Sequence, residues 1–139
     1  MIPDLQCSVV CDDVRQERNG KFILIGLFDG LGVAGFPAVF QRLCLVNRWC
    51  CGEGEFTQQS RFIGPDGKTV VMTGRPVKVK LQDGMATATS VELFLNVKFE
   101  AEGVYWIEVL LDGDLKLRYP LSARVVKPPP EMMPPPSPS

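Results

Sequence analysis

The stretch from Gly103 to Val126 alternates apolar and polar residues in a pattern that predicts a β-hairpin. Apolar residues occupy every second position in its two arms, Val104–Leu111 and Leu115–Val125. A period of two is typical of a half-buried antiparallel pair of strands. The last part of the chain that we expect to be ordered is therefore predicted to lie in an antiparallel sheet.

The parity of the two arms favours a three-residue loop between them. A two-residue loop would set the core face of one arm against the polar face of the other, because one residue of slip reverses every side chain. We therefore expect the loop Leu111–Gly113, with Gly113 forming a G1 bulge. In this register Glu108 faces Lys116, and Trp106, which points outward, faces Arg118.

Other segments carry similar strand signals. The segments that we expect to be extended are Leu5–Asp12, Val14–Arg18, Lys21–Phe28, Leu43–Cys50, Glu55–Ile63, Lys68–Met72, Val77–Gln82 and Val91–Phe99. Asn19-Gly20 predicts a tight hairpin turn between the second and third of them. Phe22–Leu27 is apolar almost throughout, which favours a central strand covered on both faces.

These segments predict an all-β fold. Phe36, Phe40 and Leu43 recur at spacings of four and three, so we expect one short helical turn near residues 37–42. Eight to ten short strands without a longer helix favour an antiparallel β-sandwich of immunoglobulin-like type. We expect one domain over residues 1–126 and a flexible, proline-rich tail over residues 127–139.

Charge and composition argue against several classes of partner. The formal net charge is -1, from 15 basic and 16 acidic residues, so no strong field favours nucleic acid or an anionic membrane. The N-terminal residues lack the pattern of a signal peptide, and no apolar run reaches membrane length. These features predict a cytoplasmic protein that binds neither nucleic acid nor membrane.

The residues of common catalytic and metal sites are scarce. The chain has no histidine, which removes Ser-His-Asp and Cys-His catalysis. Its five cysteines show no C-x-x-C spacing, so we interpret them as reduced, small buried side chains. Gly30–Gly35 matches G-x-G-x-x-G, but no long helix follows, and we interpret it as a connection between sheets. We expect no enzyme, cofactor or metal site.

Outward aromatic side chains are the first candidates for function. If Val91, Leu93, Leu95 and Val97 face the core, Phe94 faces outward. Together with Trp106 and Arg118 it would form a contact surface. The alternative is a small-ligand site, for carbohydrate or with calcium, that uses the carboxylates of Asp12 or Asp13 and has Trp49 or Trp106 as its platform.

Two resemblances support the fold. Gly103-Val104-Tyr105 followed by Ile107 resembles the G-x-Y-x-C stretch of immunoglobulin-type domains, in which the tyrosine anchors a corner and the cysteine bridges the sheets. Here Ile107 stands in place of the cysteine. The chain also resembles a family of small uncharacterised bacterial proteins over most of Leu5–Val126. The segments that carry this likeness are Cys11–Arg15, Gly20-Lys21, Ile25–Leu27, Phe36–Ala38, Gly103–Tyr105 and Leu111–Gly113. The family implies an immunoglobulin-like β-sandwich and brings no catalytic residues.

Two functional hypotheses follow. The preferred one is a non-catalytic β-sandwich that acts through protein–protein contacts, as a homo-oligomer or as an accessory or phage-related component. The alternative is a small-ligand binding module.

Overall fold

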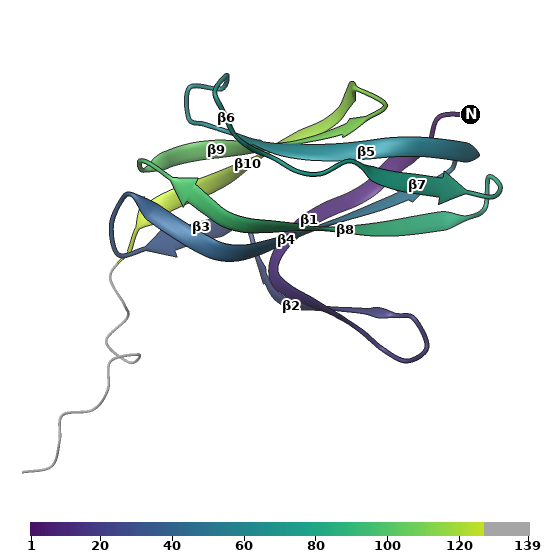
Figure 1. Cartoon of the computed structure of the whole chain (residues 1–139), viewed down its shortest axis with the longest axis horizontal. Coiled ribbons are helices and arrows are strands. Elements are labelled where there is room, and N and C mark those ends of the chain that lie inside the picture. Colours follow the sequence, from purple (N-terminus) through teal and green to yellow (C-terminus); the bar gives the residue numbers. More distant parts are fainter. Residues whose placement is uncertain (127–139) are drawn as a thin grey trace, which may run out of the picture.

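The computed structural model describes residues 1–126, which form ten strands and, within that range, no helix (Figure 1). The strands are β1 (Asp4–Gln16), β2 (Phe22–Phe28), β3 (Gly30–Val33), β4 (Ala38–Cys50), β5 (Gly54–Ile63), β6 (Val70–Thr73), β7 (Val77–Leu81), β8 (Thr87–Phe99), β9 (Gly103–Leu111) and β10 (Asp114–Val125). The all-β prediction is confirmed. The tail expected at 127–139 lies outside the described residues.

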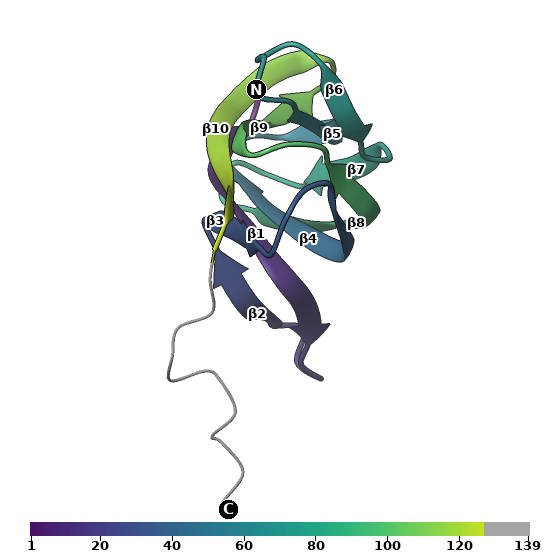
Figure 2. The same ribbon diagram turned by 90° about the vertical axis from the view of Figure 1, so that its left-hand side faces the viewer.

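The strands form two sheets that pack face to face. Sheet A has the order β2-β1-β4-β8, and sheet B has the order β3-β10-β9-β5-β6, with β7 also paired to β5. In Figure 1, β5, β6, β9 and β10 of sheet B form the upper layer and β4 and β8 of sheet A the lower one, and the β1–β2 hairpin extends away from the two layers. Figure 2 shows the same hairpin hanging below the body of the molecule.

The main core lies between the sheets. Its largest buried apolar side chains come from both layers: Leu43, Leu45, Trp49, Phe94 and Phe99 from sheet A, and Phe62, Tyr105, Ile107, Leu111 and Leu121 from sheet B. The ring of Phe62 packs edge-on against those of Phe94 and Phe99, with centroids 4.9 and 6.4 Å apart. Such edge-to-face pairs add to the stabilisation from burial.

Tyr105 forms a corner of the kind that its sequence context suggests. Its hydroxyl group donates a hydrogen bond of 2.7 Å to the carbonyl oxygen of Ala101. The ring is buried and lies edge-on to Phe99, with centroids 4.8 Å apart. The tyrosine thus ties the turn before β9 to the core.

The expected helical turn near residues 37–42 is wrong, because β4 begins at Ala38. Phe40 packs against the main core, and Leu43, three residues later, lies inside it. Successive residues of a strand point to opposite faces, so β4 changes face between Phe40 and Leu43. This change of face produces a spacing of three that resembles the helical period.

The neighbouring strand β8 changes face at the same level. Asn96 has a φ of 54°, and the pairing register of β4 with β8 omits Gln41 opposite Asn96. Val97 and Phe94 therefore both lie in the main core, although they are three residues apart. The prediction that Phe94 faces outward is wrong for this reason: the side chain is only 2% exposed.

The prediction of a covered central strand at Phe22–Leu27 is also wrong. β2 lies at the edge of sheet A and pairs only with β1 within the described residues. Five of its apolar side chains are exposed, at fractions from 39 to 61%: Phe22, Ile23, Leu24, Ile25 and Leu27. An apolar run indicates that both faces of a strand can be buried. It does not show whether other segments of the same chain bury them.

The predicted register of the β9–β10 hairpin is wrong at its loop. Leu111 pairs with Asp114, which leaves a two-residue loop of Asp112-Gly113, and the register then shifts between Leu115 and Leu117. This shift is a β-bulge. It brings the core-facing residues of the two strands opposite each other, as the alternation of apolar residues requires. Arg118 therefore lies opposite Glu108, and Pro120 lies opposite Trp106.

The segment Gly30–Val33, which we interpreted only as a connection, is itself a short strand. It is β3, and it pairs in parallel with Ser122–Val125 of β10 at the edge of sheet B. It follows β2 of sheet A, so this part of the chain does cross from one sheet to the other.

Candidate functional site

The predicted contact residues lie in different parts of the molecule. Phe94 is in the core, whereas Trp106 lies on the outer face of sheet B, between the core residues Tyr105 and Ile107. Trp106 is half-buried, and the guanidinium group of Arg118 lies 4.8 Å from the centre of its ring. The predicted three-residue surface is therefore reduced to Trp106 and Arg118.

Arg118 also belongs to a charged cluster on the same face. The carboxylate of Glu108 accepts a hydrogen bond of 2.6 Å from Nε of Arg61, and Nη1 of Arg118 lies 3.5 Å from its other oxygen. Glu108 is buried, while the two arginine side chains are about one-third exposed. The cluster neutralises a buried charge, and this explains why Arg118 is held over Trp106.

Asp12 and Asp13 are the carboxylates predicted for a ligand site, and neither forms a carboxylate pair. Asp12 is exposed, and its side chain lies over Gly26 at a place where a Cβ atom would collide with it. Asp13 pairs with Arg15 at 2.9 Å and with Arg42 at 2.8 Å. Hydrogen bonds from the Arg15 side chain and the Val14 amide lower the pKa of Asp13.

The other expected ligand groups are placed differently. Trp49 is fully buried, and its Nε1 donates a hydrogen bond of 2.6 Å to Oε1 of Gln58. It therefore does not form a surface platform for a sugar ring. Among residues 1–126, no three Cys, Asp or Glu side chains gather in a group that could hold a metal ion.

The cysteines follow the prediction only in part. Cys11 and Cys44 are buried and directly opposite each other on β1 and β4. Burial is the first cause that raises the pKa of Cys11. Cys7 and Cys51 are exposed, so they are not the small buried side chains that we expected.

Polar side chains collect in the interior between the sheets. The buried members of this group are Asn47, Gln58, Ser60, Ser90 and Glu92. Ser90 donates a hydrogen bond of 2.6 Å to Oε1 of Gln58. Neither oxygen of Glu92 has a hydrogen-bond partner of good geometry within the described chain. Burial raises the pKa of Glu92, although nearby Ser60 and Gln58 oppose the shift.

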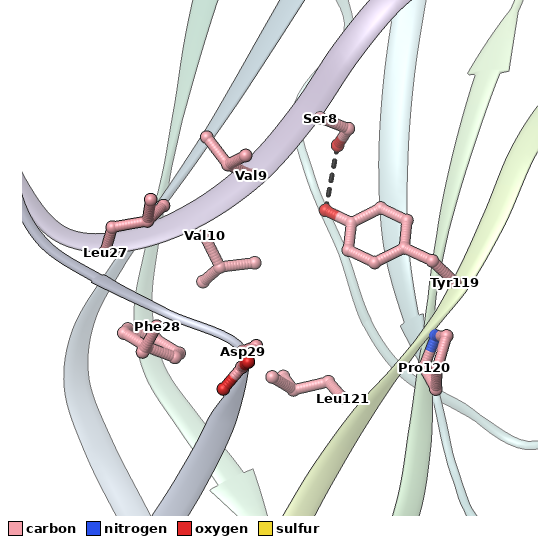
Figure 3. Close-up of a pocket in the computed structure, with 9 residues that line it drawn as sticks. All are labelled: Ser8, Val9, Val10, Leu27, Phe28, Asp29, Tyr119, Pro120 and Leu121. Carbon is pink, nitrogen blue, oxygen red and sulfur yellow. Dashed lines mark hydrogen bonds between the residues drawn. The ribbon is translucent and has the colours of Figure 1, made fainter.

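A pocket opens between the two sheets where β1 and β2 approach β10 (Figure 3). It has a volume of about 390 Å³ and a mostly apolar lining that includes Val10, Phe28 and Leu121. The hydroxyl groups of Ser8 and Tyr119 share a hydrogen bond of 2.8 Å at one side of it. Burial raises the pKa of Tyr119 to about 12, so its hydroxyl group stays protonated at neutral pH.

Apolar residues also gather on the face of sheet A that points away from sheet B, which we call the outer surface of sheet A. One row of residues crosses all four strands of this surface: Leu27 lies opposite Cys11, Cys11 opposite Cys44, and Cys44 opposite Leu93. A second row joins Val9, Val46 and Val91. All of these side chains are apolar or thiol groups.

The outer surface has a small core of its own and exposed apolar ends. Cys11, Cys44 and Val46 are buried there, with Val9, Val14 and Val91 packed against them. Leu93 and Leu95 of β8 are 49 and 52% exposed. Exposed apolar neighbours such as Leu93 and Leu95, beside a buried apolar cluster, are typical of a contact site.

The β1–β2 hairpin adds a groove to this surface. Phe22 and Leu24 of β2 line it on one side, and Val9 and Val46 of sheet A line it on the other. The volume of the groove is about 550 Å³, and Arg48 and Thr89 also line it. The hairpin therefore presents apolar residues both to this groove and to solvent.

This surface was not predicted, because the alternation in Val91–Phe99 suggested that Leu93 and Leu95 face the main core. The change of face at Asn96 turns them outward. One signal was present in the sequence: the run Phe22–Leu27 is apolar at both parities and therefore needs cover on both faces.

The fold and this site define a class of protein: a two-sheet, all-β protein with an exposed apolar surface on one sheet. The chain belongs to the family described as Family of unknown function (DUF6941), whose model matches residues 6–124. This match confirms the resemblance to an uncharacterised family. No curated protein matches the sequence.

Proposed function

We propose that this protein is a non-catalytic, immunoglobulin-like β-sandwich that acts through protein–protein contacts in the cytoplasm, as an oligomer or an accessory component. The observation that carries the proposal is the outer surface of sheet A together with β2. One apolar row runs across all four strands and ends in exposed leucines at Leu27 and Leu93. The tyrosine corner at Tyr105 supports the immunoglobulin-like assignment.

The energetic reason is the cost of leaving such a surface in water. Each square ångström of apolar surface removed from water stabilises a complex by about 25 cal/mol before the costs of association. Leu27 and Leu93 lie at the two ends of a row whose middle residues are already buried. A partner that covers these leucines would therefore enlarge an existing apolar cluster. A protein partner is the class of ligand that can cover a surface of this width.

Site-specific photo-crosslinking in cells of the source organism tests this proposal. A photoreactive amino acid would replace Leu27 or Leu93 in the full chain, and Leu115 would serve as the control. Leu115 is 52% exposed, similar to Leu93, but it lies on the β9–β10 hairpin. We expect a discrete protein adduct, identified by mass spectrometry, from position 27 or 93 and none from position 115. Absence of adducts at both sites, or equal adducts at Leu115, would contradict the proposal.

The second candidate function is small-ligand binding, which the pocket in Figure 3 favours. Its apolar walls and the hydroxyl groups of Ser8 and Tyr119 suit a small ligand with an apolar body and a polar group. A ligand-observed NMR screen of small polar-apolar compounds, including sugars with and without calcium, tests it. Binding that is lost in Tyr119→Phe supports this function, and a blank screen removes it.

A further inference from the structure

A second pocket lies on the opposite side of the sandwich from the one in Figure 3, between β8 of sheet A and the segment Met72–Val77 of sheet B. Its volume is about 480 Å³, which is within the range of pockets that bind small ligands. The lining includes the apolar side chains of Val77 and Phe94 and the charged residues Glu92 and Arg75. The pocket therefore offers a small ligand both apolar contact and charge.

The pocket lies where β5 changes its partner strand. β5 pairs with β6 over Arg61–Ile63 and with β7 over Gly54–Gln58. Between these two stretches, the amide group of Gly74 donates a hydrogen bond of 2.8 Å to the carbonyl oxygen of Ser60. The carbonyl oxygen of Gly74 accepts a bond of 2.9 Å from Nε2 of Gln59. The edge of sheet B is thus interrupted here, and a short connection takes the place of a strand.

The carboxylate of Glu92 points toward this connection. Glu92 is only 4% exposed, and its Oε1 lies 3.2 Å from the place that a Cβ atom of Gly74 would occupy. The same Cβ atom would lie 2.9 Å from the ring of Phe94, so a residue without a side chain fits here. Neither oxygen of Glu92 has a hydrogen-bond partner within the described chain. Nearby Ser60 and Gln58 bring no positive charge.

The other buried carboxylate of the described chain shows what Glu92 lacks. Glu108 is 6% exposed and forms ion pairs with Arg61 and Arg118. A buried carboxylate without a cation is costly, because it has lost its hydration and gained no partner. Arg75 lines the same pocket as Glu92, but it is exposed and forms no ion pair within residues 1–126. The pocket thus holds one group of each charge, and the two are not joined to each other.

We propose that this pocket binds an amino acid with an apolar side chain, whose amino group pairs with Glu92 and whose carboxylate pairs with Arg75. The apolar side chain would lie against Met72 and Val77, which also line the pocket. A ligand with two positive groups fits less well, because one of them would lie beside Arg75. This inference goes beyond the proposed protein–protein contacts and does not depend on them.

Entry of the amino group requires a small movement of the connection between β6 and β7. Both oxygens of Glu92 are covered in the structure, and Gly74 is the nearest part of the cover that belongs to this connection. Two hydrogen bonds hold Gly74 to β5. We therefore expect the amide groups of residues 74–77 to respond most strongly to the ligand.

Titration of the full chain with three related compounds, followed by NMR, tests the site. L-Leucine carries both charged groups, 3-methylbutylamine lacks the carboxylate, and 4-methylpentanoate lacks the amino group. We expect a dissociation constant on the order of 0.1–1 mM for leucine. The amine should bind about threefold more weakly, because Arg75 is exposed, and the acid at least about tenfold more weakly. Amide shifts should appear at residues 74–77 and 91–94 and not around Tyr119 in the pocket of Figure 3.

Two variants separate the charged groups of the pocket. Glu92→Gln keeps the size of the side chain and should weaken both leucine and the amine at least about tenfold. Arg75→Gln should weaken leucine about threefold and leave the amine unchanged. Glu102→Gln is the matched control, because Glu102 is exposed and does not line this pocket. Glu92→Gln should also raise the midpoint of thermal unfolding of the full chain, since it removes a buried charge that has no cation.

Several results would overturn the site. One is the absence of saturable leucine binding up to about 10 mM, and another is equal binding of leucine and 4-methylpentanoate. Leucine binding that Glu92→Gln leaves unchanged has the same meaning. A lower thermal midpoint in Glu92→Gln would show that the chain itself stabilises the carboxylate, and this also overturns the proposal. The proposed function is decided separately, by whether Leu27 or Leu93 forms an adduct with another protein.

Discussion

The two hairpins of this protein have exchanged the loops that the sequence predicts for them. The β1–β2 hairpin, where Asn-Gly suggests a two-residue loop, is closed by Glu17 and Lys21 around three residues, with Gly20 at a φ of 93°. The β9–β10 hairpin has two loop residues, Asp112 and Gly113, both at positive φ. These are the features of a three-residue bulged loop and of a type I′ turn, respectively.

A tertiary contact explains the two-residue loop. The amide group of Asp112 donates to the carbonyl oxygen of Thr57 at 2.8 Å, and Oδ1 of Asp112 accepts a hydrogen bond of 2.8 Å from the Thr57 amide. These two bonds to β5 hold Asp112 at its positive φ. The extra residue that the alternation of apolar residues requires is therefore Lys116, inside β10, where the pairing register shifts. The alternation of apolar residues shows that one residue of the hairpin must be left unpaired, but it does not show at which position.

The hairpins differ even more in burial than in their loops. β9 lies between β10 and β5 in the middle of sheet B, and most of its side chains are buried. β2 has a similar apolar sequence but lies at an edge and is exposed. Apolar character is thus used for the monomer core in one hairpin and, in our proposal, for association in the other.

The largest expected difference between the hairpins is in the stability of the monomer. Ile107 is fully buried in β9, and Ile25 of β2 is 44% exposed. Ile107→Ala should lower the free energy of unfolding by about 2–5 kcal/mol, and Ile25→Ala by less than about 1 kcal/mol. Urea denaturation at low micromolar concentration measures both values. Equal losses would mean that β2 is packed within the monomer.

Ion pairs should show a smaller contrast. Arg61→Ala leaves the buried carboxylate of Glu108 with only the longer contact to Arg118. Because Arg61 is partly exposed, we expect a loss of about 1–2 kcal/mol. Arg15→Ala, in the exposed Arg15–Asp13 pair of the other hairpin, should leave the urea midpoint unchanged. A double-mutant cycle of Arg61 and Glu108 isolates the pair, and a coupling energy near zero would contradict this assignment.

Much of the fold follows from local pattern, and the rest depends on contacts between distant segments. The period of two in Gly103–Val126 predicts the hairpin and the outward position of Trp106, and Gly103–Tyr105 predicts the tyrosine corner. Phe94 was misplaced because a single positive φ at Asn96 reverses the parity of β8. No sequence pattern that we used reports such a reversal, because it depends on the matching change of face in β4.

The candidate site was harder to predict than the fold for a related reason. Whether Phe22–Leu27 is central or at an edge depends on strand order, which the sequence alone does not provide. β3 illustrates the same problem: its four residues pair with β10, about ninety residues later in the chain.

The turn glycines provide a matched test at about 1 kcal/mol. Gly113 and Gly20 both have positive φ, and an added Cβ would meet no atom within 4 Å at either position. Alanine should therefore cost about 1 kcal/mol of backbone strain at each site. We expect Gly113→Ala to lower the global free energy of unfolding by that amount. Gly20→Ala should mainly increase local hydrogen exchange around residues 17–21, and an equal global loss would show that the two hairpins unfold as one unit.

The smallest expected effect is a dependence on acid that the β1–β2 hairpin shows and the β9–β10 hairpin does not. The pKa of Asp13 is lowered, first by the hydrogen bond from Arg15 and next by the Val14 amide. A lowered pKa in the folded state stabilises that state above the usual pKa of an aspartate, and the stabilisation is lost as pH falls through the lowered value. Protection factors of residues 13–25 should therefore fall below about pH 4, while those of β9 stay constant. Asp13→Asn should abolish this dependence, because its side chain carries no charge to lose. A fall in protection that persists in Asp13→Asn would assign the acid sensitivity to another carboxylate and remove this difference between the hairpins.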